Sequence, residues 1–305
     1  MISGLSLTAI NEKYVYDNGK VEQVLTKLRE IGASYEKDGA VWFKAGDFGG
    51  SEDRVLWKSV VSEGTYRLPD IAYHTTKYDR NFDMVIDIFG ADHHGTYPDV
   101  LAGLRALGYD TERIRVLIHQ FVTLTRGGKK IKMSTRKATF VTLRELIDEV
   151  GKDVVRYFFV MRSMKSHLNF DLELAKTESE ENPVFYLQYA HARIASILRN
   201  AEKREVQMKS RFNALLLKDP EVLSLLNVLG EFKEVIAICC DSLEPHHLVN
   251  YLQRLATTFH KFYTVHRVIS DDTDLTQARI ALVKSVQIVL VNGLSILGVS
   301  APDRM

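Results

Sequence analysis

The first half of the chain alternates apolar runs of strand length with stretches of helical periodicity. Apolar residues recur every three or four positions over residues 20–31, which predicts an amphipathic helix that ends at Gly32. Short, mostly apolar runs at 82–89 and 114–124 are typical of buried parallel strands, and a helical stretch that starts at Pro98 separates them. The order strand, helix, strand predicts a parallel α/β sheet.

Strand signals fade after residue 151, and helical periodicity continues to residue 297. A capping box of Thr142 and Glu145 predicts one helix that begins before residue 151. We expect an α/β fold followed by an all-α part: a partial Rossmann-like parallel sheet and then a helical bundle. The predicted domains are 1–150, 151–182 (a helical connection) and 183–305. Within them we expect helices at 153–163, 184–205, 220–240, 246–267 and 274–297, and a polar connection at 167–178.

Composition limits the classes of protein that remain. A length of 305 residues suggests about two domains, and 46% apolar residues suffice for ordinary cores. The absence of an 18-residue apolar run and of a signal-peptide pattern argues against a membrane or secreted protein. Cys239 and Cys240 are adjacent, which suits neither a disulfide framework nor a spaced metal site. We therefore expect a reducing, cytoplasmic setting.

The net charge is only +1, so any contact with nucleic acid has to come from local patches. Two stretches qualify, 126–137 and 193–211. The first, RGGKKIKMSTRK, places six basic residues and two adjacent glycines directly after an apolar run. Such a cationic loop suits a polyphosphate, although a solvated turn has the same composition.

The sequence GADHHG follows the apolar run at 82–89 and allows three interpretations. It could be a plain strand-to-helix loop. It could be the metal centre of a phosphoesterase that uses Asp92, His93 and His94, although no upstream D-x-D supplies further ligands. It could also be a nucleotide loop in which Gly90 admits a sugar and Asp92 accepts hydrogen bonds from ribose hydroxyls.

A second candidate site lies at the start of the next predicted helix upstream, where Tyr66 and Asp70 are four residues apart. Pro69 fits the first helical turn, and the helix dipole there favours an ionised Asp70. A carboxylate beside a phenol can bind a guanidinium or an amine. The alternative is a structural acid at a helix start with a packed tyrosine.

Five motifs in a fixed order resemble arginyl-tRNA synthetases, a family of class I aminoacyl-tRNA synthetases. They are TYRLPDIAYH, GADHHG, KMSTR followed by FVTL, NPVFYLQYAHAR and NGLSILGVSAPDRM, and the resemblance covers roughly residues 19–305. It implies ligation of L-arginine to tRNA(Arg), with arginyl-adenylate as intermediate and ATP with Mg²⁺ as substrate. It implies no tightly bound metal and no membrane partner.

The resemblance also assigns roles to individual residues. KMSTR resembles the family's ATP-closing KMSKS loop, so Lys132, Ser134 and Arg136 are the implied catalytic residues. Thr135 stands where the signature has its second lysine, and Arg136, Lys137 or a lysine from outside the chain would supply that charge. The implied ATP-binding residues are Gly90, Asp92, His93, Lys132 and Met133. The implied arginine-binding residues are Tyr66, Asp70 and His93, and the implied tRNA-binding residues are Tyr186, Tyr189 and Arg193. At helical spacing, the two bundle tyrosines fit a core equally well.

The sequence also departs from the family pattern in that it contains no H-x-G-H or H-x-G-N signature and lacks the family's N-terminal arginine-binding residues. We therefore expect the chain to be the C-terminal portion of such an enzyme, inactive without the N-terminal half that carries this motif. The alternative within the same resemblance is a non-catalytic tRNA-binding fragment.

Overall fold

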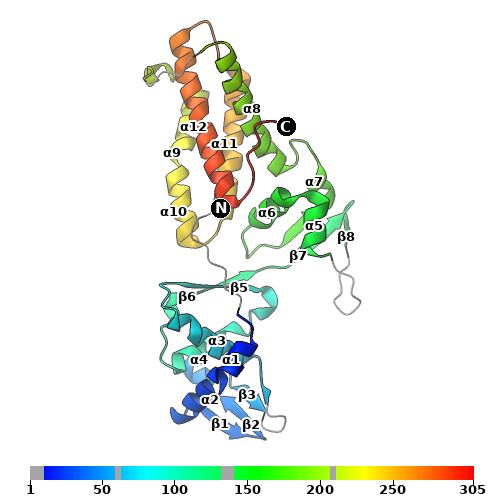
Figure 1. The fold of residues 1–305 in the computed structure, drawn as a ribbon, viewed down its shortest axis with the longest axis vertical. Helices are drawn as coiled ribbons and strands as arrows, with labels where there is room; N and C mark the ends of the chain where they lie inside the picture. Colours follow the sequence, from blue (N-terminus) through cyan, green and yellow to red (C-terminus); the bar gives the residue numbers. More distant parts are fainter. Residues whose placement is uncertain (1–9, 59–62, 132–140, 207–210) are drawn as a thin grey trace. The chain divides into compact units, whose positions relative to one another are not determined.

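The computed structural model describes residues 10–58, 63–131, 141–206 and 211–305. The chain divides into two compact units, residues 1–119 and 120–305. The sequence instead places a domain boundary near residue 150, and that boundary stays a prediction. Figure 1 colours the chain from its first residue to its last and labels the elements.

The first unit combines an antiparallel sheet, helices and a pair of parallel strands around one core. The predicted amphipathic helix is α2 (Lys20–Glu30), which buries Val21 and Leu28 and is followed by Gly32 at φ +70°. The antiparallel sheet has the order β1 (Ser34–Lys37), β2 (Ala40–Phe43), β3 (Arg54–Lys58), β4 (Glu63–Gly64). The remaining helices are α1 (Lys13–Asp17), α3 (Arg67–Asp79) and α4 (Tyr97–Ala106).

The predicted parallel strands are β5 (Val85–Gly90) and β6 (Ile114–His119), which confirms the strand–helix–strand expectation. Their register runs from Val85 opposite Ile114 to Gly90 opposite His119. One face is buried in the core, whereas Ile86 and Ile88 on the opposite face of β5 are 45% and 64% exposed. The core therefore covers only one of the two apolar faces of the parallel strand pair.

The predicted strand at 114–124 was wrong in its extent. Strand β6 ends at His119, and the following residues form β7 (Val122–Arg126), which belongs to another sheet. In the second unit β7 lies between β8 (Lys129–Lys130) and β9 (Leu168–Asp171), antiparallel to the first and parallel to the second. The predicted polar connection at 167–178 was also wrong. It contains β9, whose Leu168 and Phe170 are buried, and α7 (Leu172–Lys176).

The rest of the second unit is helical, as predicted. The capping box is present: Glu145 N donates to Thr142 Oγ1 at 3.1 Å, and Thr142 N donates to Glu145 Oε2 at 2.7 Å. The predicted helix at 220–240 is two helices that meet at Glu231. The helices are α5 (Leu143–Val150), α6 (Lys152–Val160), α8 (Pro183–Lys203), α9 (Pro220–Gly230), α10 (Phe232–Ser242), α11 (His246–Val265) and α12 (Thr273–Leu297).

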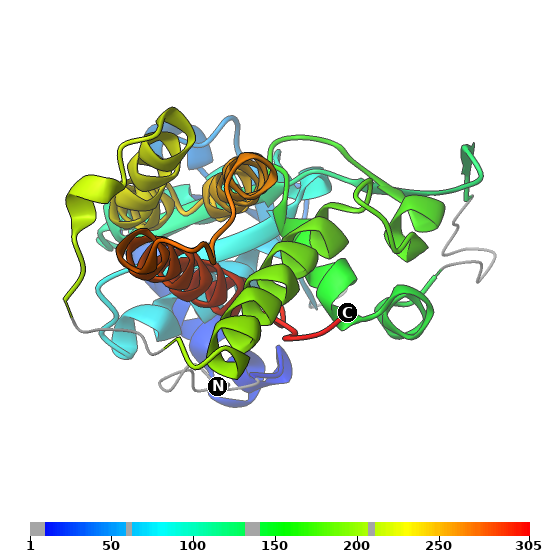
Figure 2. The same cartoon turned by 90° about the horizontal axis from the view of Figure 1, so that it is seen from above.

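The helices of the bundle pack closely around an apolar core, and α8, α11 and α12 lie side by side in the view from above (Figure 2). A Cβ added at Gly293 of α12 would lie 2.6 Å from Leu252 of α11, so only glycine permits this approach. Helix α12 is long and apolar enough to cross a membrane by length and composition. Core helices of soluble proteins pass the same test, and α12 buries Gln277 and Arg279 among its neighbours.

Candidate functional site

The loop after β5 presents polar groups at the carboxyl end of the parallel strands. A Cβ at position 90 would lie 2.6 Å from Oδ1 of Asp92, so a larger residue there would have to displace the exposed Asp92 carboxylate. The Asp92 and His93 side chains are 66% and 53% exposed, with Oδ2 and Nε2 4.0 Å apart. The His93 ring stacks on Phe89, with centroids 5.3 Å apart. This position at a strand end suits a nucleotide, and the side chains are free to contact one.

Asp70 lies in the first turn of α3, as predicted, and lines a cavity of about 190 Å³ with Glu12 and Tyr73. Burial raises the pKa of Asp70, whereas the nearby charges of His74 and His93 lower it. The helix dipole thus does not keep this carboxylate at its ordinary pKa. Asp70 and His93 lie in the same compact unit, and the charge of His93 acts on the Asp70 carboxyl group.

Tyr66 is placed differently from Asp70. It occupies the N-cap position of α3, and the residue is 86% exposed. The Asp70 backbone N–H donates to the Tyr66 carbonyl at 3.2 Å, but in the described part of the chain no hydrogen bond joins the two side chains. Tyr66 is therefore available to a ligand rather than packed as a structural tyrosine.

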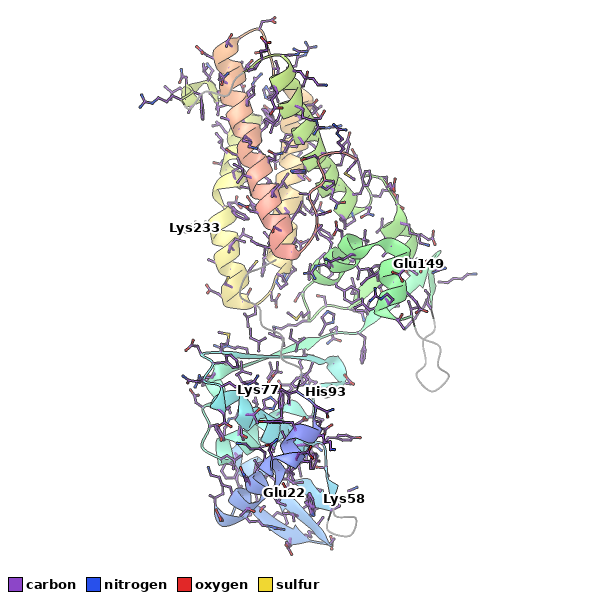
Figure 3. The ribbon with its side chains drawn as sticks, viewed as in Figure 1. Glu22, Lys58, Lys77, His93, Glu149 and Lys233 are labelled. Carbon is purple, nitrogen blue, oxygen red and sulfur yellow. The ribbon has the colours of Figure 1, made fainter. Side chains whose placement is uncertain are left out.

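Behind Asp70 lies a buried charge cluster that the sequence interpretation missed. The Nδ1 of His74 lies 2.7 Å from the Asp70 carbonyl oxygen, and its Nε2 lies 2.8 Å from Oδ2 of Asp87 on β5. Lys77 donates to the other Asp87 oxygen, and Figure 3 labels Lys77 and His93 in the same unit. Burial would raise the pKa of Asp87, but the hydrogen bonds and charges of His74 and Lys77 outweigh it and hold that pKa below its usual value. The sequence did contain one signal for this cluster: Asp87 is a charged residue within an otherwise apolar strand.

The basic stretch begins as a hairpin in the second unit. Gly127 and Gly128 have φ of +55° and +73°, which is the left-handed backbone that a tight hairpin turn requires. Arg126 pairs with Glu149 at 2.5 Å, and Lys130 is exposed at the end of β8. The predicted residues Lys132, Met133, Ser134 and Arg136 lie outside the described residues.

The Asp-His-His interpretation of the loop gains no support from the geometry. Among the described residues, the group of three whose ligand atoms converge within 4.8 Å of one another is Glu244, His246 and His247, not Asp92, His93 and His94. His94 instead packs edge-on against Tyr97, with centroids 6.2 Å apart.

The predicted tRNA-binding residues lie on α8, and two of them, Tyr189 and Arg193, line a cavity of about 670 Å³. The Arg193 guanidinium lies over the rings of Tyr189 and Tyr263, at 4.6 Å and 5.1 Å from their centroids. Tyr186 does not line this cavity; it is partly buried against the bundle core and packs on His260 at 4.9 Å. The sequence interpretation missed several residues of the cavity wall, including Tyr263, which lies 70 positions beyond Arg193. The charged lining residues are Arg193, Arg199, Lys203, Asp303 and Arg304.

Comparison with known families matches the chain to two family models, whose boundary does not coincide with that of the compact units at residue 119. Residues 4–195 match the model of the class I tRNA synthetase (R) catalytic domain, and residues 187–305 match the DALR anticodon-binding domain. A parallel strand pair with a polar loop at its carboxyl end, followed by this helical bundle, therefore defines a chain of the class I aminoacyl-tRNA synthetases.

Individual relatives narrow the class to one family. The chain is 51% identical over 297 residues to the arginine–tRNA ligase of Desulfotalea psychrophila, and 50% identical over 295 residues to that of Salinibacter ruber. These matches cover 97% of the chain and 54% and 52% of the relatives. The chain belongs to the arginyl-tRNA synthetase family, and it spans about half the length of the curated relatives it matches.

Solved structures agree with this placement. A crystal structure described as an arginyl-tRNA synthetase from Campylobacter jejuni superposes with a TM-score of 0.86 at 29% identity, covering 99% of this chain and 65% of that one. The Thermus thermophilus arginyl-tRNA synthetase shares the fold, with a TM-score of 0.80 at 21% identity over 95% of this chain and 59% of that one.

Proposed function

We propose that these residues act in the ligation of L-arginine to tRNA(Arg), with ATP converted to AMP and pyrophosphate, in the cytoplasm. The observation that carries this proposal is the match to arginine–tRNA ligases at about half identity over 97% of the chain. The reaction activates the arginine carboxylate as an adenylate by in-line displacement of pyrophosphate. No side-chain nucleophile is needed, and the residues contribute placement and electrostatic stabilisation.

The proposed arginine site combines Asp70, Tyr66 and His93. A carboxylate that accepts hydrogen bonds from a planar guanidinium favours arginine, because the compact ammonium of lysine cannot make the same forked contact. The cavity beside Asp70 provides the partly desolvated surroundings in which such a contact is strong. An exposed phenol at Tyr66 can close over the bound side chain.

The proposed ATP site uses Gly90, Asp92 and His93 for the nucleoside, together with Lys132 and Met133. Asp92 is an exposed carboxylate whose oxygens can accept from ribose hydroxyls, and Gly90 carries no side chain between that carboxylate and the backbone. Lys132, Ser134 and Arg136 are proposed to stabilise the phosphates as pyrophosphate leaves. Mg²⁺ would arrive with ATP, where it neutralises phosphate charge.

We further propose that adenylate formation requires a segment absent from these 305 residues. They contain no H-x-G-H or H-x-G-N sequence. Within the described residues, β5 pairs with β6 on one edge only, and its outer face exposes Ile86 and Ile88. An apolar face and an open strand edge favour completion by further strands, since parallel sheets are normally covered on both faces. The proposed partner is the part of the enzyme that carries the missing motif.

Arginine-dependent exchange of pyrophosphate into ATP tests this assignment. We expect the purified 305-residue chain to show no exchange above background, and addition of the N-terminal half of the Desulfotalea psychrophila ligase to restore it. Heat-treated N-terminal half and that half alone are the controls. Robust exchange by the chain alone would refute the requirement for a second segment. Restored exchange that depends on a different amino acid would refute the assignment to arginine.

We propose that the cavity on α8 binds tRNA. At its wall the Arg193 guanidinium lies over the rings of Tyr189 and Tyr263, and RNA loops are recognised by base stacking on aromatic faces and by cations along phosphates. Tyr189 and Arg193 lie at this wall, whereas Tyr186 supports it from the core side. If the chain binds tRNA but fails to restore exchange in the mixture above, the non-catalytic alternative holds.

A further inference from the structure

The connection between α10 and α11, in the second unit, brings three potential metal ligands together. Leu243 ends α10 in the left-handed conformation, at φ +58°, and the chain then turns directly into α11. Glu244 lies in this turn, and His246 and His247 are the first two residues of α11. Their ligand atoms all lie within 4.8 Å of one another.

The contacts within the group leave acceptor atoms unused. The Nδ1 of His246 lies 3.0 Å from Oε2 of Glu244, yet among the described residues this buried nitrogen has no aligned hydrogen-bond partner. The centroids of the two imidazole rings lie 4.2 Å apart with their planes tilted by 33°, so the two histidines pack against each other beside the carboxylate. A buried nitrogen without a partner costs stability, and a metal ion would supply the missing interaction.

We propose that Glu244, His246 and His247 bind one divalent transition-metal ion, with Zn²⁺ as the expected occupant. Two imidazole nitrogens and one carboxylate oxygen suit Zn²⁺ or Co²⁺, whereas Mg²⁺ and Ca²⁺ prefer oxygen ligands throughout. In a tetrahedral zinc site the ligand atoms are about 3.3–3.5 Å apart, so binding would draw these side chains, now within 4.8 Å of one another, closer together.

The packing of the α10–α11 connection holds the three side chains in place. The carboxylate of Glu244 offsets the partial positive charge at the start of α11. Leu248 and Val249 are 1% and 2% exposed in the core, which fixes the first turn of α11 and thus both histidines. The ion would tie the end of α10 to the start of α11.

Direct metal titration tests the proposal. The untagged 305-residue chain, freed of metal by chelator, is titrated with Zn²⁺ by calorimetry and with Co²⁺ by absorption spectroscopy. We expect one ion per chain, a tetrahedral Co²⁺ spectrum without thiolate charge transfer, and a higher melting temperature with Zn²⁺. No binding at one ion per chain would overturn the proposal.

Variants identify the ligands. We expect Glu244→Gln and His247→Ala each to weaken Zn²⁺ affinity by at least about tenfold while keeping the helical circular dichroism. His94→Ala is the matched control, because it removes one of two adjacent histidines from the Asp92–His94 loop and leaves this group intact; its affinity should not change. The Cys239→Ser/Cys240→Ser double variant should also bind normally. Affinity that survives Glu244→Gln and His247→Ala, or that is lost in either control, would overturn the assigned ligand set.

Discussion

At the residue scale, the proposed specificity for arginine depends on the ionised carboxylate of Asp70. Burial raises the pKa of Asp70 despite the opposing charges of His74 and His93. Only the ionised form attracts a guanidinium, so arginine binding should be constant above the raised pKa and should fall as the pH drops through it. The loss should therefore begin at a higher pH than for an aspartate in water, whose pKa is about 3.9.

Replacing Asp70 with asparagine should weaken arginine binding by roughly 10- to 150-fold, because a hydrogen bond to a charged group contributes about 1.5–3 kcal/mol. Ligand-observed NMR titration of L-arginine into the chain measures the change, since it detects weak binding. Asp79→Asn is the matched control: Asp79 ends the same helix, is 57% exposed and pairs with Lys20. Equal binding by Asp70→Asn and the unsubstituted chain would contradict the assignment.

At the element scale, α3 and β5 are joined by buried charges rather than by apolar contacts alone. His74 and Asp87 are 5% and 8% exposed, and Lys77 completes the cluster from the same helix. Because β5 leads into Gly90 and α3 carries Asp70, this cluster fixes the distance between the two proposed substrate sites. Removal of its central carboxylate would leave two buried basic groups without a counter-ion.

We expect Asp87→Asn to destabilise the first unit by roughly 2–5 kcal/mol, the cost of leaving buried charges unpaired. Both tryptophans of the chain, Trp42 and Trp57, lie in this unit, so their fluorescence in urea reports its unfolding alone. The lowered pKa of Asp87 stabilises the fold above the unfolded-state pKa, and this contribution is lost as the pH falls through the folded value. The acid-induced loss should be smaller in the variant.

Asp83→Asn, at an exposed position before β5, should leave the urea midpoint unchanged, and a shift as large as that of Asp87→Asn would argue against the cluster.

Most elements with strong periodicity or a cap could be predicted from sequence, and short ones could not. Thr142 and Glu145 marked a helix start because their reciprocal hydrogen bonds are local. β9 was missed because four residues with two buried positions carry little periodicity, and the strand exists through its long-range pairing with β7. Arg199 and Lys203 of the cavity wall fall within the basic stretch 193–211 that the sequence indicated. Tyr263 and Arg304 of the same wall, and the His74–Asp87 pair, were missed for the same reason as β9. Both unite residues from different elements, which spacing in one stretch does not reveal.

At the scale of the whole molecule, the proposed arginine site and the proposed tRNA cavity fall in different compact units, while Lys132, Ser134 and Arg136, proposed to act on ATP, fall in the residue range of the second unit. The candidate arginine and nucleoside residues, from Tyr66 to His93, belong to the first, and the cationic aromatic cavity belongs to the second. The chain spans about half of its curated relatives, and the open face of β5 is in the first unit. The second unit has an extensive core of its own. We therefore expect tRNA binding to be independent of adenylate formation.

This independence predicts that the 305-residue chain binds tRNA(Arg) even where it shows no exchange activity. Arg193→Ala should weaken binding by about 1–2 kcal/mol, or roughly 5- to 30-fold, because the guanidinium and the rings of Tyr189 and Tyr263 would present one stacking surface to a base. Arg199→Ala should lower the slope of log affinity against log salt by about one, as expected for a lost phosphate contact. Fluorescence anisotropy with labelled tRNA over a series of salt concentrations measures both effects.

Lys233→Ala is the charge-matched control, since Lys233 is exposed on α10 outside the cavity (Figure 3), and this substitution should leave the slope unchanged. If all three variants weaken binding equally, the bundle binds tRNA through diffuse charge and the cavity is not its site.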